Sequence, residues 1–230
     1  MSRYIVVGFS KPVEGREAEY NAWNNDIHLP EVMSILGFSS GQRFKVQIPV
    51  LGEMPGSYLS LCQLDADSPQ AVEAAKKALA TSVMQRTDAV DRTGGSFAGV
   101  FERFGPGKTV PGTKAGAFRL VGISQPREGR EGEYDEWYER QHMPEVLTLP
   151  GIVSGQRYKL HSAMAAGIDI SSFAYYELAA NSVEDARKTL RAMGTANLGT
   201  TTATIREKTR VAVLEVCSAR VTAPKNKAPA

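Results

Sequence analysis

The sequence predicts an α+β protein built from two ferredoxin-like βαββαβ halves that form one intrachain, pseudo-dimeric α+β barrel. The first observation is a repeat: residues 7–46 recur as residues 121–160 at an offset of 114, with 21 of 40 positions identical. The second is that each copy shows the same order of strand-like and helix-like segments, the split βαβ pattern. Such a sheet carries helices on one face only, so two halves in one chain can cover each other's open face.

The first half opens with a strand over residues 4–10, which are rich in Val and Ile. A helix follows from about Arg16, and Pro30 is expected to kink or end it near His28. The remaining elements expected in this half are a helical turn over 30–36, strands over 40–48, 58–64 and 97–104, and a helix capped by Ser68 with an apolar face of Val72, Ala75, Leu79 and Val83.

The second half is expected to repeat this order. Its expected elements are strands over 117–124, 154–162, 173–179 and 210–221, a helix over 130–141, and a helix over 183–193 capped by Ser182, with Val183, Ala186, Leu190 and Met193 on one stripe. The predicted boundaries are a first half over 1–104, a Gly/Pro-rich linker over 105–116, a second half over 117–221 and a disordered tail over 222–230.

Composition favours a small-molecule protein over a nucleic-acid or membrane partner. Lys plus Arg number 27 and Asp plus Glu 25, so the net charge of +2 provides no basic footprint. No signal peptide and no apolar run of about 20 residues is found, which predicts a cytoplasmic protein. Cys62 and Cys217 share no metal-ligand or redox spacing and are expected to be buried thiols. The fused barrel is also a candidate for further homodimerisation.

Both copies of the internal repeat contain the motif W-x4-H-x-P-E. On this motif the chain resembles the EthD-like branch of the dimeric α+β barrel superfamily. The resemblance implies a pocket between the helices and the concave face of the sheet. The superfamily includes cofactor-free lyases, isomerases and monooxygenases as well as haem enzymes, so it implies no single reaction. The matching residues are Trp23, His28, Pro30, Glu31 and Gly41–Arg43 in the first half, and Trp137, His142, Pro144, Glu145 and Gly155–Arg157 in the second.

His28 and His142 lead the candidates for acid/base chemistry, because histidine titrates near neutral pH. They occupy the same repeat position, and the alternative for each is a structural role at a helix end. The second half adds Tyr138 and His161 where the first has neutral residues, which favours the second half as the active one. The catalytic candidates are therefore His142, His161, Tyr138 and His28.

Cationic residues at alternate strand positions provide candidates for binding substrate. Arg157, Lys159 and His161 share one face of a strand, as do their counterparts from Arg43 onward. Inside a barrel this face would bind a carboxylate or phenolate or stabilise an enolate; the alternative is a solvated sheet face. The substrate-binding candidates are Arg157, Lys159, Tyr175, Glu177, Trp137 and Arg43.

The resemblance to this superfamily implies a cofactor-independent enzyme that acts on an aromatic or carbonyl-bearing metabolite, with lyase chemistry first and isomerisation next. Walker and G-x-G-x-x-G motifs are missing from the sequence. The one G-x-S-x-G match, at residues 37–41, follows an expected helical turn and leads into an expected strand, which is the reverse of the order in a nucleophile elbow. A metal site built from His142, His161 and Glu177 is conceivable but not expected. Two alternatives stay open: haem bound through an axial histidine, and a non-catalytic binder of small ligands.

Overall fold

The computed structural model describes residues 3–93, 96–164 and 170–224. Its strands are β1 (Tyr4–Ser10), β2 (Phe38–Leu51), β3 (Tyr58–Leu64), β4 (Phe97–Thr109), β5 (Phe118–Ser124), β6 (Ile152–Ala163), β7 (Ser172–Leu178), β8 (Arg210–Val216) and β9 (Val221–Thr222). Its helical segments are α1 (Glu17–Trp23), η1 (Asn24–His28), α2 (Leu29–Ser34), α3 (Pro69–Thr81), α4 (Glu131–Trp137), η2 (Tyr138–His142), α5 (Met143–Leu147), α6 (Val183–Thr195) and η3 (Arg206–Lys208).

Eight antiparallel strands close into a barrel. They follow the order β3-β1-β4-β6-β7-β5-β8-β2, and β2 pairs with β3 to complete the circle. Within the first half the order is β4-β1-β3-β2, and within the second it is β8-β5-β7-β6. The halves join at β4–β6 and at β2–β8, so neither sheet has a long free edge.

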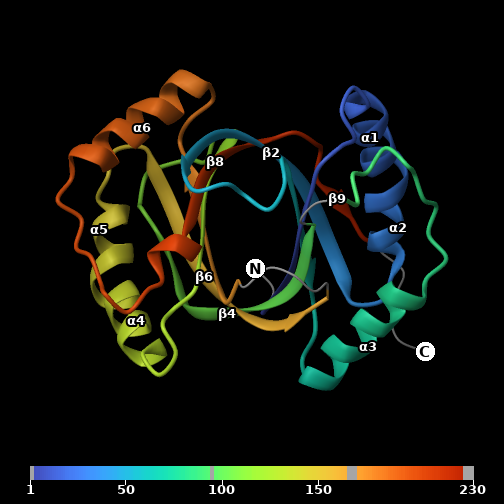
Figure 1. Ribbon diagram of the computed structural model, residues 1–230, viewed down its shortest axis with the longest axis horizontal. Helices are drawn as coiled ribbons and strands as arrows, with labels where there is room; N and C mark the ends of the chain where they lie inside the picture. The colour runs from blue at the N-terminus through green and yellow to red at the C-terminus, as the bar shows by residue number, and fades with distance from the viewer. Residues whose placement is uncertain (1–2, 94–95, 165–169, 225–230) are drawn as a thin grey trace.

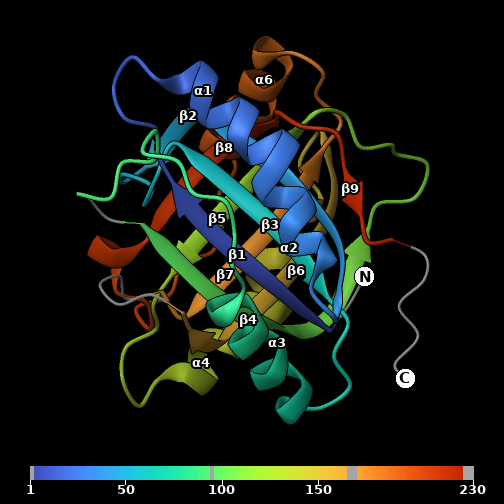
Figure 2. The same ribbon diagram turned by 90° about the vertical axis from the view of Figure 1, so that its right-hand side faces the viewer.

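The helices cover the outside of the barrel in two groups. Figure 1 looks into the barrel and shows α4, α5 and α6 on one flank and α1, α2 and α3 on the other. In Figure 2 the continuous run of α1 and α2 crosses the outer face of the first-half strands. Each strand therefore presents one face to the barrel interior and the other to a helix layer.

The barrel interior is an apolar core to which all eight barrel strands contribute. Phe9, Phe101 and Phe173 are among its fully buried side chains, together with Tyr158. The connection between β2 and β3 lies across one opening of the barrel in Figure 1, and its Met54 packs into this core. The helix–sheet layers form separate apolar clusters, one in each half. Burial on both faces explains why the strands are rich in apolar residues rather than strictly alternating.

The first helix was expected to kink or to end near His28. It does not end there, because the backbone stays helical through this point. Trp23, His28 and Leu29 all have αR dihedral angles, and the segment between α1 and α2 is a π-helical turn. The turn widens the hydrogen-bond spacing just before Pro30, which has no N–H to donate. The second half repeats this arrangement through η2, so the helix expected to stop at 141 continues into α5.

Several expected boundaries are confirmed and others are corrected. The bounds of β1 and β3 are as predicted, and Ser68 and Ser182 cap α3 and α6 by accepting the amides of Ala71 and Asp185. Val83 is fully exposed because α3 ends at Thr81, and Val183 is 37% exposed at the first turn of α6.

Strand pairing also changes the linker and tail. β4 continues to Thr109 by pairing with β6, so the first five residues of the expected 105–116 linker belong to a strand. The predicted 210–221 strand is divided into β8 and β9, and β9 pairs with β2. Thr222 of the expected tail is therefore in a strand, whereas 225–230 lie outside the described residues.

Candidate functional site

The motif histidine of each half lies against the motif tryptophan in the helix–sheet layer. The rings of Trp137 and His142 stack with centroids 4.6 Å apart and an interplanar angle of 22°. Trp23 and His28 stack at the same 4.6 Å with an angle of 16°. The π-helical turn places the histidine at its last residue, five positions after the tryptophan, and so brings the two rings together.

Burial keeps both imidazoles neutral at neutral pH. It lowers the pKa of His142 to about 4; Glu145 raises this pKa and Arg157 lowers it further. Burial also lowers the pKa of His28, with Glu31 and Arg43 acting in the same opposing senses. A neutral imidazole is a proton acceptor, and its burial makes the protonated form costly.

The two halves differ in how well their polar ring atoms are paired. Nδ1 of His28 and Nδ1 of His142 are both buried without a hydrogen-bond partner in the described part of the chain. Nε1 of Trp23 donates to the carbonyl oxygen of Gln85 at 3.0 Å. Nε1 of Trp137 is buried and has no such partner among the described residues. The second half therefore holds two unpaired polar nitrogens on one stacked ring pair, and a bound ligand could pair with them.

A pair of tyrosines lies beside the second-half histidine. The ring of Tyr138 meets that of His142 edge-on at 4.9 Å, and its hydroxyl is 3.0 Å from that of Tyr176. Burial raises the pKa of both tyrosines above the ordinary value, so both hydroxyls stay protonated and can donate. The first half has Asn24 and Cys62 at the equivalent positions.

Arg157 is fully buried on the outer face of β6, not inside the barrel as the sequence-based prediction allowed. It forms ion pairs with Asp135 at 3.0 Å and Glu139 at 3.5 Å, both from the helix above. Its guanidinium also lies 4.3 Å from the centroid of Tyr138. The residue therefore ties the π-helical turn to the sheet, and its charge is balanced by the protein itself.

Arg43 occupies the same place in the first half, with neutral partners. It is fully buried and donates through Nη1 to Oδ1 of Asn25 at 2.8 Å and through Nη2 to Oδ1 of Asn21 at 3.0 Å. The rings of Tyr20 and Tyr58 each lie 5.0 Å from its guanidinium.

Lys159 and His161 share the outer face with Arg157, as the alternation predicted, but they have different neighbours. Lys159 pairs with Asp135 near the surface. His161 meets the ring of Tyr4 at 5.4 Å and lies 4.0 Å from the carboxylate of Glu102. The structure thus places His161 against the first half rather than beside the Trp137–His142 pair.

Tyr175 and Glu177 lie on the interior side of β7, separate from the histidines. The hydroxyl of Tyr175 accepts from Nε of Arg119 at 2.7 Å, and Glu177 is 3.7 Å from the same guanidinium. They help line an interior cavity of about 30 Å³, to which Arg220 also contributes. Grouping these two residues with His142 at one site is therefore wrong. The side chains of Tyr175 and Glu177 face the barrel interior, whereas His142 lies in the helix layer on the other side of the sheet.

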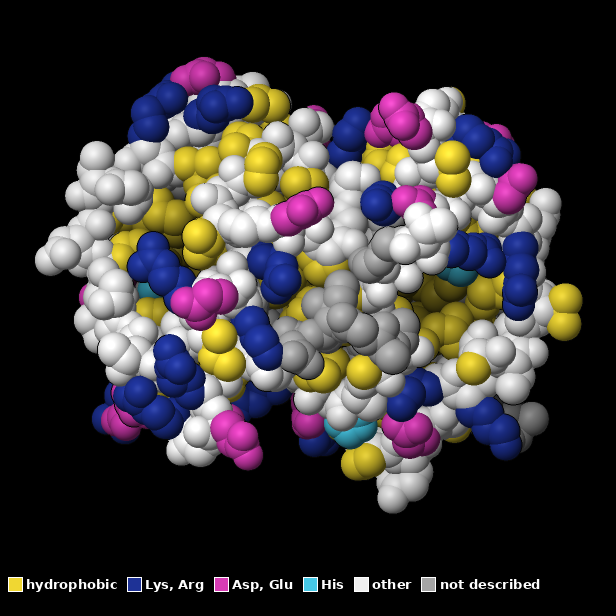
Figure 3. Space-filling view, in the orientation of Figure 1, with side chains coloured by type: hydrophobic (Ala, Val, Ile, Leu, Met, Phe, Trp, Pro, Cys, Tyr) yellow, Lys and Arg dark blue, Asp and Glu magenta, His cyan; other side chains and the backbone are white. Residues whose placement is uncertain are grey.

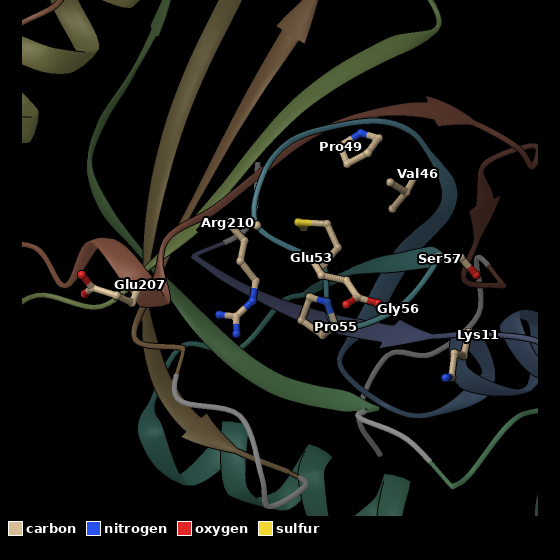
Figure 4. Close-up of a pocket in the computed structure, with 11 residues that line it drawn as sticks. Lys11, Val46, Pro49, Glu53, Pro55, Gly56, Ser57, Glu207 and Arg210 are labelled. Carbon is tan, nitrogen blue, oxygen red and sulfur yellow. The ribbon is translucent and has the colours of Figure 1, made fainter.

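A larger cavity of about 650 Å³ opens at the barrel mouth, a place that the sequence reasoning did not identify. Figure 4 shows it between the connection of β2 to β3, which carries Glu53 and Pro55, and the segment that carries Glu207 and Arg210. Its charged residues are of both signs. Acidic and basic side chains are likewise interspersed over the face in Figure 3.

The motif glutamates have a role that the sequence reasoning did not identify. Glu145 accepts the backbone amide of Gly199 at 2.7 Å, and Glu31 accepts that of Gln85 at 3.2 Å. Gly199 and Gln85 lie in the segments that follow α6 and α3, and they are also 114 residues apart. Each glutamate therefore fastens a loop over the helix that carries its histidine. The matched loop positions were a sequence signal for this role.

The residues present do not fit haem, and the described residues hold no group of three metal-ligating side chains. A haem-ligating histidine normally donates its second ring N–H to a protein acceptor, whereas Nδ1 of His28 and of His142 lacks one. Each imidazole is also covered by a stacked indole. Neither histidine lines any of five prominent cavities, which range from about 30 to about 1010 Å³.

Among the described residues, none of the helices has the length and apolar character that a membrane-spanning segment needs.

Neither a protein-family model nor a curated protein sequence matches this chain. Among solved structures, it is similar to an anthrone oxidase-like protein, with a TM-score of 0.58, 10% identity and coverage of 99% of this chain and 95% of the other. It is also similar to a chlorite dismutase variant from Candidatus Nitrospira defluvii in complex with cyanide, with a TM-score of 0.50, 12% identity and coverage of 92% and 90%. The likeness places the chain among dimeric α+β barrel folds.

Proposed function

We propose that this protein is a cofactor-independent enzyme that acts on a small aromatic or carbonyl-bearing metabolite, with His142 as the group that moves a proton. One observation carries the proposal: the stacked Trp137–His142 pair has two buried polar nitrogens with no hydrogen-bond partner in the described part of the chain. Leaving such groups unpaired costs free energy, which a substrate with matching polar atoms would recover. Because His142 lines none of the five cavities, the proposal requires the loop that Glu145 holds at Gly199 to move aside before a substrate reaches these atoms.

The surrounding residues support lyase chemistry by dehydration of a β-hydroxy carbonyl compound. The neutral imidazole of His142 accepts a proton from the carbon next to the carbonyl, and the negative charge of the enolate formed beside it offsets the cost of the buried imidazolium. The protonated hydroxyls of Tyr138 and Tyr176 supply a hydrogen bond to the oxygen that becomes an enolate. The imidazolium then returns its proton to the departing hydroxyl, so water leaves and the imidazole is again neutral.

We further propose that the repeat is a tandem duplication of one ferredoxin-like unit, and that the chain belongs with the EthD-like proteins. The shared W-x4-H-x-P-E motif and the matching strand orders of the two halves support both statements. A single chain would then form the barrel that two separate units form in a dimer. We also propose that this fused barrel associates into a homodimer and that the protein acts in the cytoplasm.

The proposal is tested without knowing the natural substrate by measuring deuterium exchange next to the carbonyl of aromatic β-hydroxy ketones. Exchange reports removal of the carbon-bound proton, and ultraviolet absorbance of the conjugated product reports loss of water. We expect catalysis of both by the purified protein. His142→Gln should reduce exchange roughly 100-fold or more, and Tyr138→Phe should also reduce it.

The matched variant is His28→Gln, which removes the equivalent imidazole from the first half. We expect it to cause a smaller loss than His142→Gln, with both variants folded by circular dichroism. Equal losses would contradict the assignment of catalysis to the second half. If the protein catalysed deuterium exchange with none of the aromatic β-hydroxy ketones tested, the enzyme proposal would be contradicted.

A further inference from the structure

The two halves treat the same buried arginine in opposite ways. Arg157 lies under two carboxylates, those of Asp135 and Glu139. At the equivalent positions, Arg43 lies under two neutral amides. The contact of Nη2 is the same, since it lies 3.0 Å from Oδ1 of the first partner in both halves. The contact of Nη1 is shorter in the first half, at 2.8 Å to Asn25 against 3.5 Å to Glu139. What differs is charge: one guanidinium is neutralised within the protein and the other is not.

No carboxylate forms an ion pair with Arg43 among residues 3–93, 96–164 and 170–224. Glu17, which lies nearby, is instead paired with Lys45 and with the hydroxyl of Tyr58. The thiol of Cys217 stays neutral because burial raises its pKa. The guanidinium of Arg43 is therefore fully buried and positively charged, and no carboxylate among the described residues pairs with it. Such a charge is normally paired.

Arg43 also has hydrogen-bonding capacity left over. A guanidinium has five N–H donors. Side-chain oxygens accept from one N–H on each Nη atom of Arg43, and Nε is buried with no partner in the described part of the chain, as is Nε of Arg157. The spare donors are therefore common to both halves, and only the missing carboxylates distinguish Arg43. Asn21 and Asn25 are only partly buried, and Nδ2 of Asn21 also donates to the hydroxyl of Tyr58 at 3.0 Å. A bidentate acceptor would reach both Nη atoms by displacing the two amide oxygens and this contact.

We propose that Arg43 in the first half is the receptor for a small organic carboxylate, which takes the place of the amide oxygens of Asn21 and Asn25. In the second half, the carboxylates of Asp135 and Glu139 occupy the equivalent positions on Arg157, so a ligand carboxylate cannot bind there. The rings of Tyr20 and Tyr58 beside the guanidinium favour an aromatic carboxylate. This site is separate from the Trp137–His142 pair and does not rest on the proposed reaction.

The proposal is tested by exchanging the amide and carboxylate residues between the two halves. Benzoate is the probe, and benzamide is its uncharged analogue. Isothermal calorimetry is expected to show one benzoate bound per chain and no binding of benzamide. Asn21→Asp/Asn25→Asp gives Arg43 internal carboxylates of unchanged size, and should weaken benzoate at least 10-fold. Asp135→Asn/Glu139→Gln makes the reverse change in the second half, and should raise the number of bound benzoates to two.

Thermal unfolding separates loss of the site from loss of the fold. Asn21→Asp/Asn25→Asp should melt at or above the wild-type temperature without ligand, because it neutralises a buried charge. Benzoate should raise the melting temperature of the wild type but not of this variant. The proposal is overturned if wild type does not bind benzoate, if Asn21→Asp/Asn25→Asp binds it as tightly, or if benzamide binds equally well. Turnover is not measured, so the result is independent of the catalytic proposal.

Discussion

At the scale of single residues, burial has more effect than nearby charge on the two motif histidines. Each imidazole has a glutamate that raises its pKa and an arginine that lowers it, and desolvation exceeds both. The stacked indole removes water from one ring face without supplying a hydrogen bond. The result is a proton acceptor that is uncharged across the physiological range and that costs stability when it is protonated.

This cost predicts a specific acid sensitivity. The unfolded chain binds a proton at His142 below about pH 6.5, whereas the folded chain does so only below about pH 4. Between these values the unfolded state holds more protons, so stability falls as pH falls, and His142 alone should account for roughly 3 kcal/mol. We expect chemical denaturation to show this decline between pH 6.5 and 4 and no further contribution from His142 below it.

His142→Gln removes the titrating group while keeping a planar polar side chain. The variant should lose less stability than wild type over the same pH interval, with the difference close to the His142 contribution. His28→Gln tests the same physics in the first half, where burial also lowers the pKa. An unchanged pH dependence in His142→Gln would show that the imidazole is accessible to protons in the folded state.

At the scale of elements, each helix that carries a histidine is covered by a loop that the motif glutamate holds. The amides of Gly199 and Gln85 are the donors, and both acceptors are carboxylates. Hydrogen bonds to charged groups are stronger than neutral ones, so a single contact can order such a segment. In the first loop the indole of Trp23 also holds Gln85 itself, whereas the indole of Trp137 has no partner among the described residues. The second loop is instead held three residues beyond Gly199, where Arg127 and Arg130 donate to the carbonyl oxygen of Thr202.

Glu145→Ala is therefore expected to loosen the loop that follows α6. Loss of a charged hydrogen bond worth about 1.5–3 kcal/mol should speed amide exchange at Gly199 by roughly 10- to 100-fold, measured by hydrogen–deuterium exchange. Glu31→Ala is the matched control and should act on Gln85, with a smaller effect because Trp23 still holds that loop. Equal acceleration at both amides in both variants would point to global destabilisation instead.

The sequence reasoning succeeded where local chemistry determines an element. The serine caps of α3 and α6 and the bounds of β1 and β3 depend on short patterns, and they are confirmed. Pro30 was harder, because local geometry favours a helix end there, while packing against the sheet maintains a helix through a π-helical turn. The extension of β4 into the Gly/Pro-rich segment depends on its partner β6, which local composition does not reveal.

The candidate site was predicted only in part for a related reason. The repeat identified the histidines, and strand alternation correctly put Arg157 and Lys159 on one face. Alternation alone does not tell which face points into a closed barrel, so the sequence left Arg157 either inside the barrel or on a solvated face. In the structure it is in neither place, because it is buried between β6 and the helix layer. Tyr175 and Glu177 were grouped with His142 by comparison of the halves, although their strand turns them into the interior.

At the scale of the whole molecule, the two halves depend on each other through one shared core. The interior cluster draws on strands from both halves, and the pairs β4–β6 and β2–β8 supply backbone hydrogen bonds across both seams. The covalent connection between the halves is hydrogen-bonded at its two ends, from the amide of Val110 to Val153 and from that of Gly116 to Leu178. Between them, at Gly112, no described atom lies within 4 Å of the place of a Cβ.

Cutting this connection should therefore leave the barrel intact. A protease site inserted after Gly112 would give two fragments, which we expect to elute together at the mass of the whole chain and to melt in one transition. The melting temperature should become dependent on protein concentration, because association of the fragments is no longer intramolecular. Fragments that separate in native conditions, or that melt independently, would mean that each half has its own stable core. Joint melting would instead establish the shared interior as the main source of cooperativity, since the cut leaves every strand pairing across the two seams available.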